Sequence, residues 1–137
     1  MPGRIVTAVV LRTDVPSGAT GRAALVVSVA DTARALGSGD VEVLGTPRLI
    51  ALCEEATVAA LEDYLPAGWT TVAMRVQFDH LAPVPIGASV TADAVLDKIE
   101  GRRLFFTVTT NDAAGLVGAG RVTRVAVERE RFLAKAR

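Results

Sequence analysis

The stretch TPRLIALCEEATVAALEDYL, residues 46 to 65, has the length and composition of a long helix. Its interior is rich in alanine, leucine and glutamate, which are strong helix formers. Thr46 is a good N-cap residue, and Pro47 suits the first helical position. The Pro-Ala-Gly sequence at residues 66 to 68 then ends the helix. We therefore predict one long helix, around which the rest of the chain must be arranged.

One carboxylate lies inside the apolar face of this predicted helix. At about 100° per residue, with Ile50 at the centre of the face, Glu54 falls between Leu61 and Leu65. The other apolar members of the face are Leu49, Cys53, Ala56, Val58, Ala60 and Tyr64. A buried carboxylate without a partner is costly. Glu54 therefore either reaches an edge or a structural arginine, or faces a pocket as a functional carboxylate.

Most of the remaining chain has the pattern of β-strands. Long strands are predicted at 69 to 79, 88 to 99, 102 to 111 and 116 to 128, with a short turn at Glu100–Gly101 and a shorter strand at 22 to 29. The sequence DTARALGSGD reads as a short helix or turn, and RERFLAKAR as a short helical tail. Antiparallel strands around one helix predict an α+β domain with a curved sheet covered on one face by the helix.

The chain length suits one domain. We assign residues 21–137 to this domain and residues 1–20 to an N-terminal arm or an extra strand, because RIVTAVVLR is compatible with either.

The single histidine ends the strand WTTVAMRVQFDH. Val72, Met74, Val76 and Phe78 alternate onto one side of this strand, which is predicted to face the helix. If the strand continues through residue 80, His80 points to the same side. A lone histidine is more often structural or superficial than catalytic, but it is also the side chain best suited to exchange protons near neutral pH. The pattern leaves both interpretations open.

Composition argues against several classes of function. Fifteen basic residues balance fifteen acidic ones and aromatic residues make up 4%, so we expect no nucleic-acid partner. No apolar run is long enough for a membrane span, so no membrane partner is expected. The single cysteine, Cys53, excludes an internal disulfide, favours a cytoplasmic location and is expected to be a small buried apolar residue. With one histidine, no metal site is expected.

Four segments together resemble the fluoroacetyl-CoA thioesterase family of hot-dog proteins: VLGTPRLIALCEEA, VAMRVQFDHLAPVPIGASV, DKIEGRRLFFTVTTND and GAGRVTRVAVERERF. The resemblance extends from about residue 20 to the end of the chain. It implies a hot-dog fold, in which a long central helix is wrapped by a curved antiparallel sheet. It also implies a homodimer or homotetramer with the active site at the subunit interface. The long strand edges independently favour a homodimer, since unpaired edges need a partner.

The resemblance also implies a set of site residues. The catalytic threonine, glutamate and histidine of the family match Thr46, Glu54 and His80. A backbone contact to the acyl group falls near Ala73, where the family has glycine, and an arginine near the substrate matches Arg124. The implied activity is hydrolysis of a small or medium acyl-CoA, with coenzyme A as part of the substrate and no further cofactor.

This chain departs from the family pattern at the entrance to the acyl site. The fluoroacetate-specific enzyme has aromatic gate residues before the helix, whereas this chain has ALGSGD and no aromatic residue there. We therefore do not expect specificity for fluoroacetyl-CoA. A non-catalytic protein that binds acyl-CoA or an acyl carrier is the main alternative, and a structural dimer module without a ligand is a third. A hot-dog hydratase is a weaker alternative, since the short Asp–His spacing of those enzymes is not found in this sequence.

Overall fold

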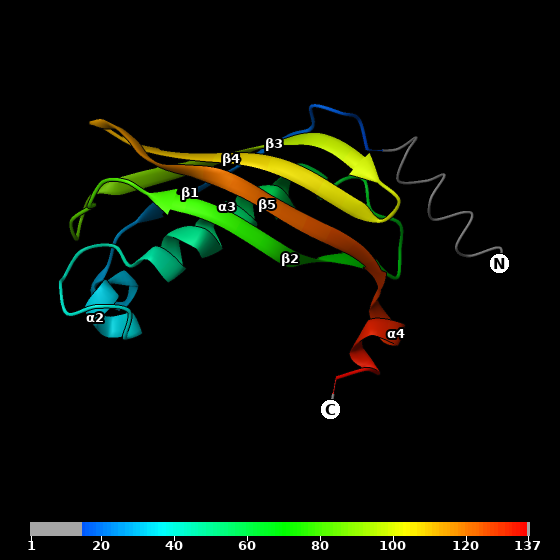
Figure 1. The fold of residues 1–137 in the computed structure, drawn as a ribbon, viewed down its shortest axis with the longest axis horizontal. Coiled ribbons are helices and arrows are strands. Elements are labelled where there is room, and N and C mark those ends of the chain that lie inside the picture. The colour runs from blue at the N-terminus through cyan, green and yellow to red at the C-terminus, as the bar shows by residue number, and fades with distance from the viewer. Residues whose placement is uncertain (1–14, 137) are drawn as a thin grey trace.

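The computed structural model describes residues 15–136 and shows one long helix packed against a curved, five-stranded antiparallel sheet (Figure 1). The strands are β1 (Thr20–Val26), β2 (Trp69–His80), β3 (Ser89–Glu100), β4 (Arg103–Asp112) and β5 (Gly115–Glu128). The helices are α2 (Ala33–Leu36), α3 (Thr46–Leu61) and α4 (Arg129–Leu133), and a 3-10 turn, η1 (Val29–Asp31), precedes α2. The predicted α+β architecture is confirmed.

The sheet has the strand order β1-β3-β4-β5-β2, so the two strands nearest in sequence to α3 form its edges. β2 is the longer edge strand, with twelve residues. The β3–β4 hairpin turns through Gly101 and Arg102, one residue later than predicted, with Gly101 at a positive φ of 63°. Of the predicted arm or strand at residues 1–20, residues 1–14 lie outside the described part of the chain, and Gly18 and Ala19 hydrogen-bond to Leu96 of β3.

The core lies between α3 and the concave face of the sheet. The buried residues of α3 are Leu49, Leu52, Cys53, Ala56, Thr57, Ala60 and Leu61. The helix lies against β1 so closely that Gly21 has no room for a side chain, since a Cβ there would collide with the backbone of Ala56 and Ala60. Helix and sheet are thus in direct backbone contact at one end, and side chains on the helix hold positions set by the strands beneath them.

The buried face of α3 is rotated from the face that the sequence predicted. Ile50, placed at the centre, is only partly buried, and Val58 is 50% exposed. The helix also ends at Leu61, four residues before the predicted end. The apolar stripe is wider than the surface that the sheet covers, and the edge left uncovered carries Glu54.

A β-bulge in β2 changes which residues face the helix. The pairing of β2 with β5 shifts between Ala73 and Arg75, so Met74 has no partner of its own. Before the bulge it is Thr71 that is buried, and after it Val76, Phe78 and His80 are less exposed than their neighbours. The predicted inward side was therefore wrong for Val72 and Met74, and Met74 is 48% exposed. The alternation is broken because a bulge adds one residue to one strand.

Candidate active site

His80 faces α3, as its strand parity predicted. Its Nδ1 lies 2.7 Å from Thr46 Oγ1, and its Nε2 lies 3.0 Å from the carbonyl oxygen of Ala82. A carbonyl only accepts, so Nε2 carries a proton and donates it to Ala82. In the neutral imidazole Nδ1 then accepts the hydroxyl proton of Thr46. The residue pair joins the end of β2 to the first turn of α3.

Thr46 does not cap the helix, so that prediction was wrong. Gly45 takes the N-cap position in extended conformation, and its carbonyl accepts from the N–H of Leu49. Glycine suits residue 45, since a Cβ there would displace the end of the Leu36 side chain at 2.9 Å and would lie 3.1 Å from the backbone of Ala33, closer than an ordinary contact. With Gly45 as the cap, the hydroxyl of Thr46 is released from the role of a capping group and is used by His80 instead.

Arg124 is a buried cation on β5, with only 5% of its surface exposed. Its Nε donates to Thr71 Oγ1 at 2.8 Å, and its Nη2 donates to the carbonyl oxygen of Thr71 at 2.9 Å. Its Nη1 lies 3.4 Å from Thr57 Oγ1, a longer hydrogen bond. Burial lowers the pKa of Arg124, and the charge of Glu54 opposes this effect. An arginine nevertheless stays protonated in a protein.

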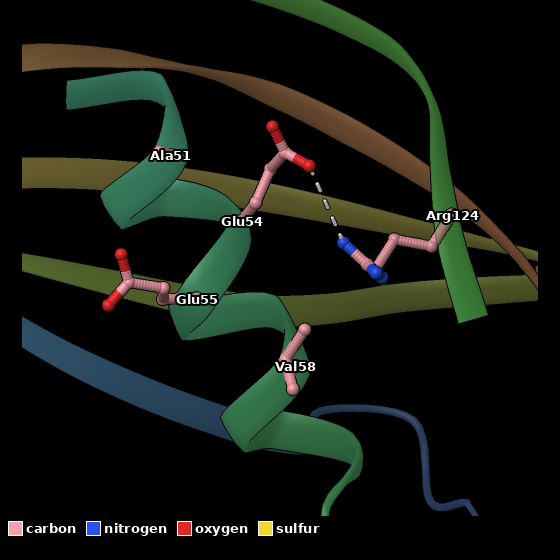
Figure 2. Close-up of a pocket in the computed structure, with 5 residues that line it drawn as sticks. All are labelled: Ala51, Glu54, Glu55, Val58 and Arg124. Atoms are coloured by element: carbon pink, nitrogen blue, oxygen red, sulfur yellow. Dashed lines mark ion pairs between the residues drawn. The ribbon is translucent and has the colours of Figure 1, made fainter. Parts of the chain in front are cut away.

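Glu54 lies at the margin of the buried face, with 37% of its side chain exposed. Its Oε1 is 3.9 Å from Nη1 of Arg124, which is an ion pair but too long for a hydrogen bond (Figure 2). The sequence predicted Glu54 within the apolar stripe; it stands at the edge of that stripe, where it meets an arginine. Its carboxylate is thus oriented by charge and remains open to solvent.

A pocket opens beside these two residues. It is lined by Ala51, Glu54, Glu55, Val58 and Arg124 and has a volume of about 350 Å³ (Figure 2). Two apolar side chains, three charged ones and an open mouth are suited to a ligand with an apolar end and a polar reacting group.

Ala73 is connected through the sheet to Arg124, one of the residues that line this pocket. It is the β2 residue paired with Arg124, and the bulge follows it directly. The pocket therefore lies close to the free edge of β2. The backbone contact between Ala73 and an acyl group remains a prediction.

The structure brings the predicted residues together in two groups. Thr46 and His80 form one. Glu54 and Arg124 line the pocket in the other, with Ala73 paired to Arg124 in the sheet. Within residues 15–136 no hydrogen bond or ion pair joins the two groups. Along α3 the two groups are eight residues apart, which is about 12 Å at 1.5 Å per residue.

Sequence reasoning missed Thr57 and Thr71. Thr57 could have been recognised from the sequence, because a threonine within an alanine-rich helix face is a polar group that needs a hydrogen-bond partner. Thr71 was hidden by the bulge, which gave it the wrong predicted side. In residues 15–136 no group of three or more His, Cys, Asp or Glu side chains is placed to hold a metal ion.

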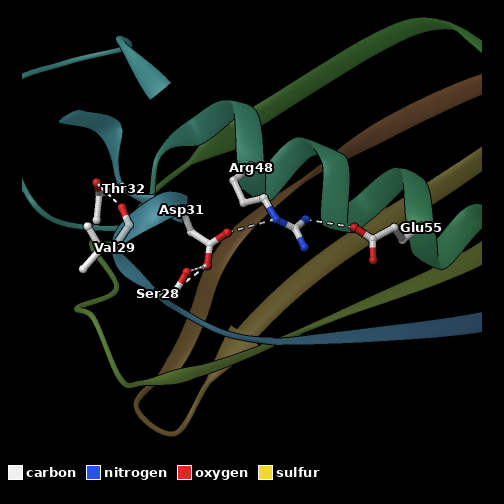
Figure 3. A network of polar contacts seen from close by, with 6 residues as sticks. All are labelled: Ser28, Val29, Asp31, Thr32, Arg48 and Glu55. Atoms are coloured by element: carbon white, nitrogen blue, oxygen red, sulfur yellow. Dashed lines mark hydrogen bonds and ion pairs between the residues drawn. The ribbon is translucent and has the colours of Figure 1, made fainter. Parts of the chain in front are cut away.

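A second polar network borders the pocket through Glu55. Arg48 lies 2.8 Å from Glu55 and 3.3 Å from Asp31 of η1 (Figure 3). The backbone N–H of Ser28, its hydroxyl and the guanidinium of Arg48 lower the pKa of Asp31, against the effect of burial. This network fixes the segment before α3 to the helix.

The family model described as fluoroacetyl-CoA-specific thioesterase matches residues 27–130 of this chain. The chain belongs to this family. A curated relative, the fluoroacetyl-CoA thioesterase of Streptantibioticus cattleyicolor, is 35% identical over 96 residues, which is 70% of this chain and 69% of the relative. The predicted relationship and the prediction of a thioesterase-like protein are confirmed.

Solved structures confirm the hot-dog fold of this fluoroacetyl-CoA thioesterase family member. A structure of the fluoroacetyl-CoA thioesterase superposes with a TM-score of 0.82 at 31% identity, covering 88% of this chain and 93% of that one. A hot-dog-like protein from Thermanaerovibrio acidaminovorans gives 0.83 at 27% identity, covering 91% and 93%. Mutants of the fluoroacetyl-CoA thioesterase have been solved with fluoroacetate and CoA, and with acetyl-CoA.

Cys53 neighbours Glu54 in sequence but is fully buried, as predicted. Burial, and then the charge of Glu54, raise the pKa of its thiol to about 12. At pH 8 about one thiol in ten thousand is then ionised, and the thiolate is the reactive form.

We expect no measurable alkylation of native Cys53 by iodoacetamide in one hour at pH 8, and complete alkylation in guanidinium. The mass of the intact protein measures the extent of alkylation in the native protein and in guanidinium. Rapid stoichiometric labelling of the native protein would show that the thiol is accessible and activated.

Proposed function

We propose that this chain hydrolyses the thioester of a small or medium acyl-CoA. Its membership of a thioesterase family supports a hydrolase, and a mutant of the related enzyme has been solved with acetyl-CoA. The observation that carries the proposal is the open pocket, in which Glu54 faces solvent beside a buried arginine. The cytoplasm stays the predicted compartment. Among the described residues no helix is both long and apolar enough to cross a membrane.

Thioester hydrolysis needs a nucleophile or a base, a proton donor, and donors for the developing oxyanion. Glu54 acts as the nucleophile or as the base that activates water, because no hydrogen bond occupies its side chain in the described residues. His80 moves protons toward the leaving thiolate, with Thr46 orienting its ring at 2.7 Å. Arg124 supplies positive charge at the pocket, where negative charge develops on the substrate. Ala73 presents backbone to the acyl group.

The alternative, an acyl-CoA-binding protein without catalysis, would use the same pocket and tolerate loss of Glu54. Glu54→Gln distinguishes the hydrolase from the binding protein, because it keeps the shape of the side chain and removes its charge. The variant should lose turnover if the chain is a hydrolase and should keep acyl-CoA binding if it is a binding protein. Binding without turnover in the wild type would favour the alternative.

His80 is expected to be essential for turnover. His80→Ala should lower kcat by about a hundredfold or more, the usual scale for loss of a general acid or base. Its fold should persist, because His80 lies at a strand end and is only partly buried. The measurement is steady-state thiol release, after both proteins are shown to melt cooperatively. Asp79→Ala, an exposed neighbour on the same strand, is the matched control and should retain kcat. Full turnover in folded His80→Ala would return His80 to a structural role.

Fluoroacetyl-CoA is not expected to be a preferred substrate. The segment ALGSGD, residues 35 to 40, has no aromatic side chain with which to close the acyl entrance. We expect kcat/KM for fluoroacetyl-CoA within about tenfold of acetyl-CoA or another short acyl-CoA, measured by thiol release from a panel of short, long and aryl acyl-CoAs. A preference above about a hundredfold, which is near 2.7 kcal/mol of transition-state binding, would contradict this interpretation of the entrance.

We further propose that the active site is shared between two subunits of a homodimer paired through β2. The twelve-residue edge of β2 has backbone groups available for pairing. The pocket lies beside that edge, since Arg124 of the pocket pairs with Ala73 of β2, and Met74 at the bulge is half exposed. The separation of about 12 Å along α3 between Thr46 and Glu54 supports a site that combines Glu54 of one subunit with His80 of the other. A tetramer built from two such dimers is compatible with this arrangement.

Light scattering at micromolar concentration should therefore give at least a dimer mass, and a monomer would contradict the proposal. Complementation is a sharper measurement. Glu54→Gln and His80→Ala are each expected to be inactive alone, but a mixed dimer with shared sites has one site of wild-type composition. Random mixing after denaturation and refolding should restore about a quarter of wild-type turnover by that symmetry. No restoration, with mixed dimers shown by native mass spectrometry, would place the whole site in one subunit.

A further inference from the structure

Arg124 is held by uncharged acceptors. The two oxygens nearest to it, at 2.8 and 2.9 Å, are the hydroxyl and the carbonyl of Thr71, and the third is the hydroxyl of Thr57. A buried cation is ordinarily neutralised by a carboxylate in direct hydrogen-bond contact. In the part of the chain that the structure describes, the ion pair of Arg124 is with Glu54, at 3.9 Å. The positive charge is thus fixed in place without being neutralised at close range.

Thr57 is oriented for this task by its own hydrogen bond. Its hydroxyl donates to the backbone carbonyl oxygen of Glu54, one turn earlier in α3, at 2.6 Å. Because the single hydroxyl proton is used there, only the lone pairs of the oxygen are available to Arg124. The same threonine therefore contacts the helix turn that carries Glu54 and the guanidinium that faces Glu54. Its side chain is fully buried, which leaves water no access to these contacts.

We propose that Thr57 and Thr71 are positioning residues for thioester hydrolysis, which hold the guanidinium of Arg124 at the wall of the pocket, facing Glu54 and the substrate. The inference rests on the proposed function. Uncharged acceptors serve this purpose better than a carboxylate, because they fix the geometry and leave the charge of the guanidinium to act on negative charge that develops during the reaction. A charge already oriented before the reaction needs no reorganisation in the transition state.

The test replaces each hydroxyl by a methyl group of the same shape. Thr71→Val and Thr57→Val should each lower kcat about tenfold with KM changed less than threefold, because small displacements of a positioned group act on the chemical step. Thr71→Ser and Thr57→Ser keep the oxygen and should retain kcat within about twofold. Since both residues act through Arg124, the double valine variant should lose less than the product of the two single losses.

Thr110→Val is the matched control. Thr110 is a fully buried threonine of β4 whose hydroxyl donates to the carbonyl of Gly118 at 3.1 Å, away from Arg124. This variant loses a buried hydroxyl and its hydrogen bond, and should melt earlier than wild type while retaining kcat. If Thr110→Val loses as much kcat as Thr71→Val, or if both threonine-to-valine variants at 57 and 71 keep wild-type kcat, the proposal is overturned.

A spectroscopic measurement keeps this test separate from the test of the proposed function. In ¹⁵N-arginine-labelled protein, the Nε–H of Arg124, assigned through Arg124→Lys, should exchange slowly with water because it donates to buried Thr71. Thr71→Val should make that exchange at least tenfold faster, and Thr110→Val should not. Unchanged exchange in Thr71→Val would refute the positioning directly. If the wild type cleaves no acyl-CoA but the three proteins show this exchange pattern, the proposed hydrolase activity is contradicted. The positioning of Arg124 by Thr71 is then still supported.

Discussion

The buried guanidinium of Arg124 is the interaction on which the candidate site depends. It lies between the sheet and α3, and it contacts Thr71 on β2, Thr57 on α3 and, at longer range, Glu54. A charge taken out of water is strongly unfavourable unless its donors are satisfied. The strand and the helix must therefore keep the relative position at which these oxygens meet Arg124. The same requirement that stabilises the helix on the sheet also fixes the wall of the pocket.

The bulge at Met74 makes this contact possible. Had β2 alternated without interruption from His80 back to its start, Val72 would have taken the place of Thr71, and its side chain cannot accept a hydrogen bond. The extra residue reverses the alternation, so Thr71 faces inward at one end of the strand while His80 faces inward at the other. One local irregularity thus allows a single strand to serve both groups of the site. Bulges are frequent next to active sites for this reason.

Much of the fold followed from the sequence, because apolar periodicity and turn residues act locally. The long helix, the strands that follow it, the short helix before it and the helical tail were all predicted. The rotation of α3 was missed: its apolar stripe is wider than the face covered by the sheet, and a wheel centred on Ile50 cannot tell covered from uncovered apolar residues. Thr46 was taken for the N-cap because Gly45 leaves no side-chain signal.

The site was predictable only in part. Glu54 and His80 stood out as polar groups in apolar patterns, whereas the roles of Thr46 and Arg124 came from the family resemblance. The Thr71–Arg124 contact could not be derived, because it joins residues 53 positions apart across a bulge. Which group of the site meets which across a subunit interface depends on contacts between chains, and these have no periodic signature within one chain.

The network around Arg48 anchors the segment between η1 and α3. Asp31 is held to α3 by its ion pair with Arg48. Gly45, the N-cap of α3, donates a backbone hydrogen bond to the carbonyl of Asp31. Between these two anchors Ala33 and Leu36 lie against Gly45, whereas residues 37–40 are exposed and can change in size without moving Thr46. An entrance without aromatic residues and an intact Thr46–His80 pair are then compatible. We therefore expect the absence of an aromatic gate to alter the choice of acyl group, while the Thr46–His80 contact is kept.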